Sequence, residues 1–400
     1  MKYKFILKKG VNTENTIYID PKNETSLDKL FLKLIYIGKL SKSSKIILNL
    51  DEVYNEDLKQ FIIDFITIQT YNYKTPDLIN NINIRKSLIG TVINEVRHMI
   101  DSPPNIMDIF TITEYIQQNT PSNIKIDILD ENDLIRLNMN YILGMNNGSS
   151  KPAKMIVLTY NTNNDKPVIL VGKGVIFDSG GINLKRGNFS NMKSDKSGAL
   201  YVWGLIKSLA INEVNGHFIG IMPFIENMPG NRAIHPGDIL KGCDGRTVEV
   251  VNTDAEGRVI LADALCWANK NISNPKLTID LATLTGAVGN IFGNLGTGLM
   301  CNKHGEKYAD ELIKIGDEIR EYFWKLPLHR AFKNYLNSNV ADYRNYSDDI
   351  SAGTIMAGMF LAEYAPQNTP WIHLDIAGVA YKKYSTGEPM LALYYFLINL

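Results

Sequence analysis

The chain has 400 residues, 45% of them hydrophobic, so it can bury a large core, and its length favours two domains over one. Its 42 basic and 42 acidic residues cancel, which argues against a protein that binds nucleic acid or a membrane surface. No apolar run approaches the roughly 18 residues of a membrane span, and the apolar centre of residues 1–9 is too short for a signal peptide.

Strand-like and helix-like segments in the first part of the chain predict a small α/β domain at residues 1–75. Its expected strands cover residues 2–7, 16–19 and 45–50, and its expected amphipathic helices cover 26–40 and 56–66. The polar stretch after Thr75-Pro76 and a helix over 85–100 then form a linker at 76–101. This helix must end before Pro103-Pro104, because proline cannot continue it.

Residues 102–400 form the larger predicted domain, which we expect to be the catalytic one. Strand-like runs alternate there with helical ones, and the expected strands cover residues 154–158, 168–171, 218–222, 277–281 and 373–376. Such alternation predicts an α/β fold in which a central mixed sheet is flanked by helices.

The cysteines Cys243, Cys266 and Cys301 are odd in number and lack C-x-x-C spacing. We therefore expect neither a disulfide framework nor a thiolate metal site. A reducing, cytoplasmic location fits this composition.

The segment 251–258, V-N-T-D-A-E-G-R, is the most informative part of the chain. It lies between an apolar run and a helix-like run, as expected for a strand end and a turn. Asp254 and Glu256 are two apart, so in an extended chain they share a face, and Arg258 can follow on the same side. Clustered carboxylates repel unless a cation neutralises them, and their hard oxygens suit divalent metals. An isolated D-x-E-x-R is more often a solvated acidic turn.

A second group of charged residues precedes it. The apolar run 170–177 contains Lys173 and ends in Asp178-Ser179-Gly180-Gly181, and Lys185 and Asp195 follow. Together the two blocks resemble the leucyl aminopeptidases, the dinuclear-metal cytosol peptidases. The signature of that family is N-T-D-A-E-G-R, and its upstream block reads roughly V-G-K-G-x-x-F-D-S-G-G-x-x-x-K.

The resemblance extends almost continuously from about residue 85 to the end of the chain. Between Lys185 and Asp195 the chain is one residue shorter than the usual family spacing. Further matching blocks are D-S-P-P-N at 101–105, E-N-M-P at 226–229, H-P-G-D at 235–238, D-L-A-T-L-T-G-A at 280–287 and W-I-H-L-D-I-A-G-V-A at 371–380.

The resemblance implies two divalent metal ions, either zinc or, at an exchangeable position, manganese, magnesium or cobalt. Asp178 and Glu256 would bridge the two ions, and Lys173 would bind as a neutral amine, which nearby cations and burial favour. Taken singly, each residue would be an ordinary surface charge. The full implied ligand set is Lys173, Asp178, Asp195, Asp254 and Glu256.

Lys185 and Arg258 are the catalytic residues that the resemblance implies. A protonated Lys185 can polarise the scissile carbonyl and stabilise the developing oxyanion. Arg258 offers a planar fork for a carboxylate-like anion, which in the family is bicarbonate acting as general base.

The implied substrates are peptides with a free amino terminus. Met192, Thr283 and Gly286 would surround the first side chain, and Leu284 would supply backbone contacts. Methionine adapts to varied shapes, so a preference for leucine-like residues would be a bias. For Met192 the alternative is simple core filling.

We therefore expect a metal-dependent aminopeptidase, a leucyl aminopeptidase that forms a homohexamer in the cytoplasm. Two alternatives remain open at this point. One is a non-catalytic scaffold or DNA-binding protein with the same fold, against which the charge balance speaks. The other is a peptidase restricted to Cys-Gly-type dipeptides.

Overall fold

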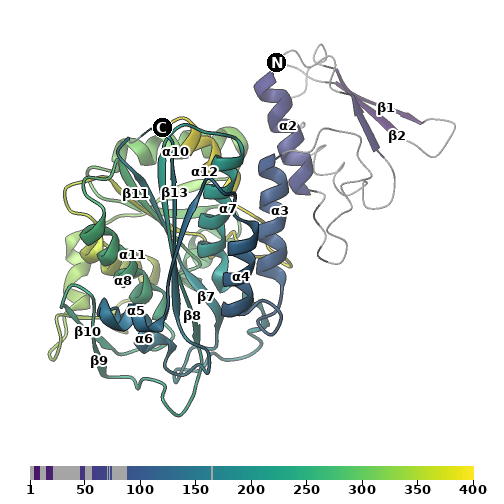
Figure 1. The fold of residues 1–400 in the computed structure, drawn as a ribbon. Coiled ribbons are helices and arrows are strands. Elements are labelled where there is room, and N and C mark those ends of the chain that lie inside the picture. Colours follow the sequence, from purple (N-terminus) through teal and green to yellow (C-terminus); the bar gives the residue numbers. More distant parts are fainter. Residues whose placement is uncertain are drawn as a thin grey trace. The chain divides into compact units, whose positions relative to one another are not determined.

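The computed structural model describes residues 4–9, 15–20, 46–49, 56–69, 71, 73, 88–163 and 165–400. The chain divides into two compact units, Met1–His98 and Met99–Leu400 (Figure 1). The helix predicted at 26–40 lies outside the described residues.

The first unit contains a three-stranded sheet and helical segments. Strand β1 (Lys4–Lys9) pairs antiparallel with β2 (Asn15–Asp20), and β2 pairs parallel with β3 (Ile46–Asn49). Helix α2 covers Glu56–Gln69 and α3 covers Leu88–Asp101. The three predicted strands and the helices predicted at 56–66 and 85–100 are thus confirmed within one to three residues at most ends.

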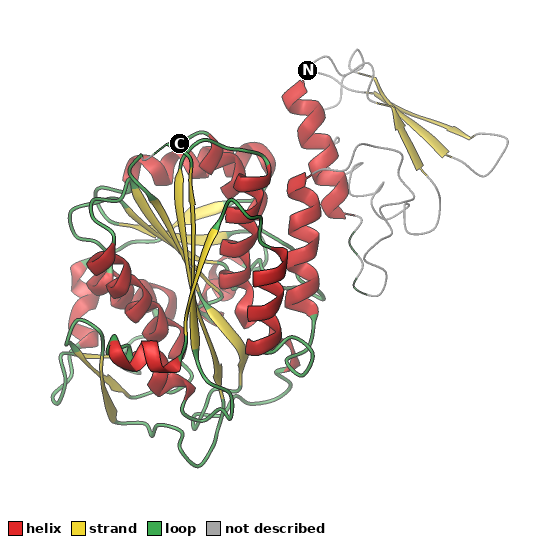
Figure 2. Ribbon diagram, in the orientation of Figure 1, coloured by secondary structure: helices red, strands yellow, loops and turns green. Residues whose placement is uncertain are grey.

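The second unit is built on a nine-stranded mixed sheet (Figure 2). Its strand order is β13-β12-β15-β11-β6-β8-β5-β4, and β7 also pairs with β8. The central strands β15, β11, β6 and β8 are parallel, whereas β12, β5 and β4 introduce antiparallel pairs. The strands are β4 (Lys125–Leu129), β5 (Lys154–Asn161), β6 (Val168–Gly172), β7 (Gly174–Asp178), β8 (His217–Asn227), β11 (Leu277–Ala282), β12 (Thr297–Cys301), β13 (Phe323–Lys325) and β15 (Trp371–Asp375).

Helices cover both faces of this sheet. Helices α4 (Ile109–Asn119) and α7 (Ser197–Ile211) lie on one side, and α8 (Glu256–Asn271) and α11 (Gly353–Tyr364) lie on the other (Figure 1). Strands β6 and β11 are buried along their whole length; β6 is apolar throughout, whereas β11 also buries Thr278 and Asp280. The predicted fold class, a central mixed sheet flanked by helices, is confirmed.

The remaining elements complete the second unit. None of the described helices is both long and apolar enough to span a bilayer. A small sheet has the order β14-β10-β9. The elements are α5 (Glu131–Arg136), α6 (Asn140–Asn146), the 3₁₀ helix η2 (Ser190–Lys196), β9 (Asp238–Lys241), β10 (Thr247–Val250), α9 (Gly286–Phe292), α10 (Glu306–Ile319), η3 (Arg330–Leu336), β14 (Tyr343–Arg344) and α12 (Met390–Ile398).

The strand structure is interrupted between β6 and β7, and the polar residues of the candidate site lie at this point of the sheet. Strands β6 and β7 both pair parallel with β8, one after the other, and Lys173 is the residue between them. The backbone of Lys173 still bonds on both sides, to the Leu281 carbonyl and the Ala199 amide. Its side chain therefore starts at the carboxyl ends of β6 and β11, where open α/β sheets place their ligand sites.

The expectation about cysteines is wrong for one pair. Cys243, in the β9–β10 loop, and Cys266, on α8, form a disulfide across a sequence separation of 23, and Cys301 is free. The number and spacing of the cysteines did not indicate this pair, because the packing of α8 against the β9–β10 loop brings Cys243 and Cys266 together.

Candidate metal centre

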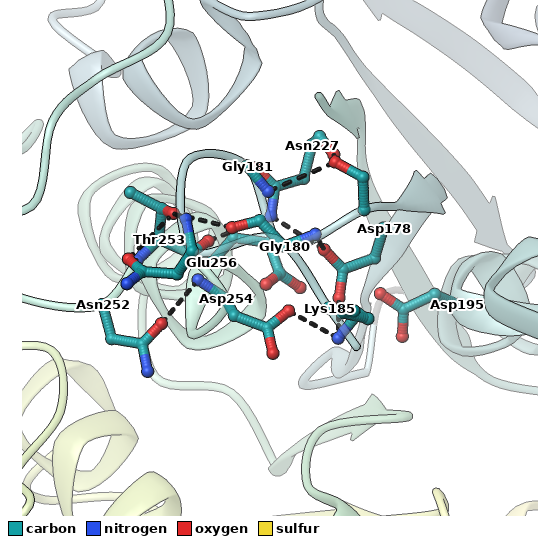
Figure 3. A network of polar contacts seen from close by, with 12 residues as sticks. Asp178, Gly180, Gly181, Lys185, Asp195, Asn227, Asn252, Thr253, Asp254 and Glu256 are labelled. Carbon is teal, nitrogen blue, oxygen red and sulfur yellow. Dashed lines mark hydrogen bonds and ion pairs between the residues drawn. The ribbon is translucent and has the colours of Figure 1, made fainter. Parts of the chain in front are cut away.

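Asp178 is the last residue of β7 and begins the site. Its side chain is buried, and Oδ1 accepts hydrogen bonds from Asn227 Nδ2 (2.8 Å) and from the Gly180 amide (2.9 Å). Asn227 ends the neighbouring strand β8 and also donates to the Thr253 carbonyl (2.9 Å). Two neighbouring strand ends therefore fix one oxygen of Asp178 and leave the other, Oδ2, facing the cluster (Figure 3).

The loop after Asp178 and the acidic turn hold each other in place. Thr253 donates to the Gly180 carbonyl (2.6 Å) through Oγ1, and its amide donates to Asn183 Oδ1 (2.8 Å). Gly180 and Gly181 have positive φ angles of 91° and 64°. Non-glycine residues rarely adopt such angles, so the glycines permit the chain reversal that brings the two segments together (Figure 3).

Asp254 and Glu256 converge by a turn. The predicted strand end and turn are confirmed, since β10 ends at Val250 and Asp254 lies in a turn. The extended geometry considered for Asp254 and Glu256 does not apply, because Glu256 is already the first residue of α8. Asp254 is fixed through its amide, which donates to Asn252 Oδ1 (2.8 Å). Even so, Asp178, Asp254 and Glu256 each offer a carboxylate oxygen within 4.8 Å of the others. A strand end, a turn and a helix start thus supply one acidic cluster.

Lys173 and Asp195 complete the cluster from the opposite side. Lys173 Nζ lies 2.8 Å from Asp195 Oδ2, 2.9 Å from Glu256 Oε1 and 3.0 Å from the Thr283 carbonyl oxygen. Asp195 belongs to η2, and its Oδ1 also accepts from Thr283 Oγ1 (2.7 Å). The side chains of Lys173 and Asp195 are only 3% and 6% exposed. The shorter loop after Lys185 therefore still delivers Asp195 to the cluster.

The carboxylates of this cluster are difficult to ionise together. Burial, reinforced by the charge of Asp178, raises the pKa of Asp254 and raises that of Glu256 to about 8. Burial also opposes the charge of Lys173, but the Asp195 and Glu256 carboxylates outweigh it and raise its pKa. The site therefore has more buried negative charge than its lysines neutralise, which is the electrostatic condition for binding cations.

Lys185 spans the outer side of the cluster. Its Nζ lies 2.6 Å from Asp178 Oδ2 and 2.5 Å from Asp254 Oδ1. Burial opposes its charge, but Asp178 and its other acidic neighbours raise the pKa above the ordinary lysine value. The side chain is 20% exposed, so this residue contacts the cluster and still reaches solvent.

Arg258 is on α8, two residues after Glu256. It is buried, donates from Nη1 to the Asn345 carbonyl (3.0 Å), and its Nε has no hydrogen-bond partner within the described residues. Burial lowers its pKa to about 10, although Glu256 and Asp375 partly offset the effect. A buried guanidinium with free donor capacity suits an anion.

Of the four predicted substrate residues, Thr283 contacts the cluster directly. Met192 is half-buried on η2, three residues before Asp195. Thr283 and Leu284 follow β11 directly and are half-buried, while Gly286 is exposed at the start of α9. The structure thus brings Thr283 into contact with Asp195 and leaves Gly286 open to solvent.

The residues present fit divalent cations by their chemistry. Glu256 Oε1 lies 2.9 Å from Lys173 Nζ, whereas Oε2 is buried and has no hydrogen-bond partner among the described residues. A buried carboxylate oxygen without a partner is costly, and hard oxygen donors are what divalent cations prefer.

A comparison with protein-family models matches residues 94–393 to the cytosol aminopeptidase family, catalytic domain. The chain belongs to this family. It is 39% identical over 318 residues to a probable cytosol aminopeptidase of Agrobacterium fabrum, covering 79% of this chain and 62% of that protein. The family resemblance is confirmed.

The fold of this chain is also similar to that of solved structures. The cytosol aminopeptidase of Coxiella burnetii is 28% identical, with a TM-score of 0.81 over 92% of this chain and 84% of that one. The bottromycin maturation enzyme BotP, solved in complex with Mn, has a TM-score of 0.86 over 99% of this chain and 93% of that one. At 24% identity the latter shows the fold alone.

Sequence reasoning missed the residues that hold the cluster in shape. Asn227 was visible within E-N-M-P, but nothing in that motif indicated a bond to Asp178. Asn345 lies about 90 residues beyond the acidic turn that it contacts. Only the folded chain shows these pairings, since both are made across separate segments.

Proposed function

We propose that the chain is a metal-dependent aminopeptidase that releases amino-terminal residues from peptides, with a preference for leucine-like side chains. The observation that carries the proposal is the convergence of Asp178, Asp254 and Glu256 within 4.8 Å, from three local structures. Since the chain spans 62% of the length of the Agrobacterium relative, its activity and substrates are inferred from the site.

Two divalent ions would be held by Lys173, Asp178, Asp195, Asp254 and Glu256. Lys173 would bind as a neutral amine, and the carboxylates would supply oxygen ligands. Zinc, or manganese, magnesium or cobalt at an exchangeable position, fits these ligands. Such ions supply a water of lowered pKa and stabilise charge at the attacked carbonyl.

Lys185 and Arg258 would act around this centre. The contacts of Lys185 with Asp178 and Asp254 support a protonated amine, which can donate a hydrogen bond to the scissile carbonyl oxygen and stabilise the oxyanion. The unpartnered Nε of Arg258 supports an anion site, for which we propose bicarbonate.

The substrate would be a peptide with a free amino terminus. Met192, Thr283 and Gly286 would surround its first side chain, and the backbone of Leu284 would contact the peptide. The half-buried positions of Met192 and Thr283 beside Asp195 support this arrangement, because they border the cluster and still reach solvent.

Hydrolysis of leucine p-nitroanilide by chelator-stripped protein tests the proposal, with zinc, manganese, magnesium or cobalt added back. Activity should return with metal and be absent in Asp254→Ala. The matched control is Asp310→Ala, which removes an exposed carboxylate on α10 that has no contact with the cluster residues among the described ones. Folded protein without activity under any metal would refute the proposal and favour a scaffold. Cleavage of Cys-Gly alone in a dipeptide panel would restrict the specificity to that class.

We further propose a homohexameric, cytoplasmic enzyme, with domains at 1–75 and 102–400 joined by 76–101. Light scattering tests the assembly, since a mass equal to the 45.0 kDa single chain at micromolar concentration would contradict the hexamer. Neutral net charge supports the absence of nucleic-acid binding, which a salt-dependent shift assay checks.

A further inference from the structure

A buried carboxylate outside the metal cluster lies at the end of β15. Asp375 is fully buried and is the last residue of this strand. Strand β15 runs parallel to β11, and Asp375 is in register with Ala282, the last residue of β11. The side chain of Asp375 is therefore next to the segment 283–286 that leaves β11.

All the hydrogen-bond partners of Asp375 are donors. Its Oδ1 accepts from the amides of Leu284 (3.2 Å), Thr285 (3.4 Å) and Ala377 (3.2 Å), and its Oδ2 accepts from Thr285 Oγ1 (2.6 Å). An ionised carboxylate, which only accepts, satisfies such a set. Bonds of this charge-assisted kind are stronger than neutral ones, so they fix the backbone that donates them.

Thr285 connects Asp375 to the start of α9 by hydrogen bonds. It is the N-cap of α9, where its Oγ1 accepts from the Val288 amide (3.3 Å), and it also lies 2.7 Å from Thr354 Oγ1 on α11. The hydroxyl of Thr285 is thus oriented by three partners, one of which is Asp375. Loss of the Asp375 charge would release both Thr285 and the first turn of the helix.

The other end of the segment is tied to the metal cluster. The Thr283 carbonyl accepts from Lys173 Nζ (3.0 Å), and Thr283 Oγ1 donates to Asp195 Oδ1 (2.7 Å). Residues 283–285 therefore extend between the cluster and Asp375. The same stretch is the one proposed above to border the first side chain of the peptide.

We propose that Asp375 is a positioning residue that sets substrate specificity: it fixes the backbone at Leu284 and Thr285 and so the shape of the pocket for the first side chain. This inference rests on the proposed aminopeptidase function. Asp375 acts through the segment 283–286 and does not itself touch the peptide.

Asp375→Asn, compared with Asp280→Asn, tests the proposal. Asp280 is equally buried on the neighbouring strand β11, where it contacts Trp371 Nε1 (2.7 Å) and His373 Nδ1 (2.5 Å). In the described part of the chain its side chain has no hydrogen bond to 283–286. Both substitutions keep side-chain size and remove one buried charge, so a general loss of stability would affect both.

For Asp375→Asn we expect the KM for leucine p-nitroanilide to rise about tenfold, with a smaller change in kcat, as the loss of one charge-assisted hydrogen bond predicts. The ratio of kcat/KM for leucine to that for alanine p-nitroanilide should change as well. Asp280→Asn should lower the unfolding temperature and leave that ratio unchanged.

The outcomes separate this inference from the function on which it rests. If wild type is active and Asp375→Asn changes only stability, or Asp280→Asn changes the leucine-to-alanine ratio equally, the positioning role is refuted. A folded but inactive wild type would instead refute the proposed function, and the inference with it.

Discussion

Replacing Asn345 by alanine should weaken metal binding together with the fold. The Asn345 side chain is fully buried and holds the acidic turn by four hydrogen bonds. Its amide donates to the carbonyls of Asn252 (2.7 Å) and Ala255 (3.2 Å), and its oxygen accepts from the amides of Val251 (3.0 Å) and Asn252 (3.3 Å). These backbone groups flank Asp254, so their release would let its carboxylate move.

The size of the effect follows from those four bonds. At about 1 kcal/mol of net stability for each, Asn345→Ala should cost about 3–4 kcal/mol in the free energy of unfolding. Groups that support metal ligands typically contribute about 10- to 100-fold to metal affinity, so Mn²⁺ binding should weaken by at least about tenfold. The second effect is specific to this position, whereas the first is common to buried asparagines.

Urea unfolding of metal-free protein and calorimetric Mn²⁺ titration measure the two effects. Asn302→Ala is the matched control, because Asn302 also makes four side-chain bonds to backbone, to Pro366 and Thr369 and from Gly305 and Trp371. It should lose a similar amount of stability and bind Mn²⁺ as wild type does. Equal Mn²⁺ affinity in Asn345→Ala and wild type would show that the turn needs no such support.

Two further predictions follow from buried backbone and charge. Gly180→Ala should abolish activity, because the added Cβ would collide with the Asn183 carbonyl and lie 2.9 Å from Asp254 Oδ1. Gly187→Ala, in the same loop, is the control. Its Cβ meets no atom within 4 Å, so it should cost only the strain of its positive φ. An active Gly180→Ala enzyme would contradict this.

A second prediction concerns the pH dependence of stability. Burial raises the pKa of Glu321 from 4.5 to about 8, so the folded protein keeps a proton that the unfolded chain releases. Through Glu321, stability should therefore fall by up to about 1.4 kcal/mol per pH unit between those pKa values. In urea unfolding at about pH 5 to 8, Glu321→Gln should remove this contribution and leave that of Glu256 and Asp263, whose pKa values burial also raises.

The sequence was sufficient to predict those features that depend on residues close together in the chain. The strand-like runs at 168–171 and 277–281 predict strands, and every residue of the corresponding strands β6 and β11 is buried. The motif around Asp254 and Glu256 predicted a pair of ligands, and their carboxylates do meet. The predicted strand end and turn are present, but the two carboxylates meet through the turn and the start of α8, and not through the extended backbone that the shared-face argument assumed.

The sequence was insufficient to predict contacts between segments that are far apart in the chain. Neither Asn345 nor Asp375 stands out by residue type, since single buried polar residues occur throughout a domain of this size. The Cys243–Cys266 disulfide was likewise excluded by counting cysteines, although α8 and the β9–β10 loop bring the pair together. In each case tertiary packing supplies the partner, and one sequence carries no record of which residues pack.

The site combines two kinds of constraint that explain why it lies at this edge of the sheet. Parallel strands β6, β11 and β15 end together, so Lys173, Thr283 and Asp375 emerge side by side from a rigid base. The carboxylates of Asp254 and Glu256 come from a turn and a helix start, which need outside support. A rigid base without this support would leave the carboxylates free to separate, since their mutual repulsion opposes the cluster. Cation binding therefore stabilises the arrangement that binds it, so metal affinity and fold stability should change together whenever the supporting contacts are altered.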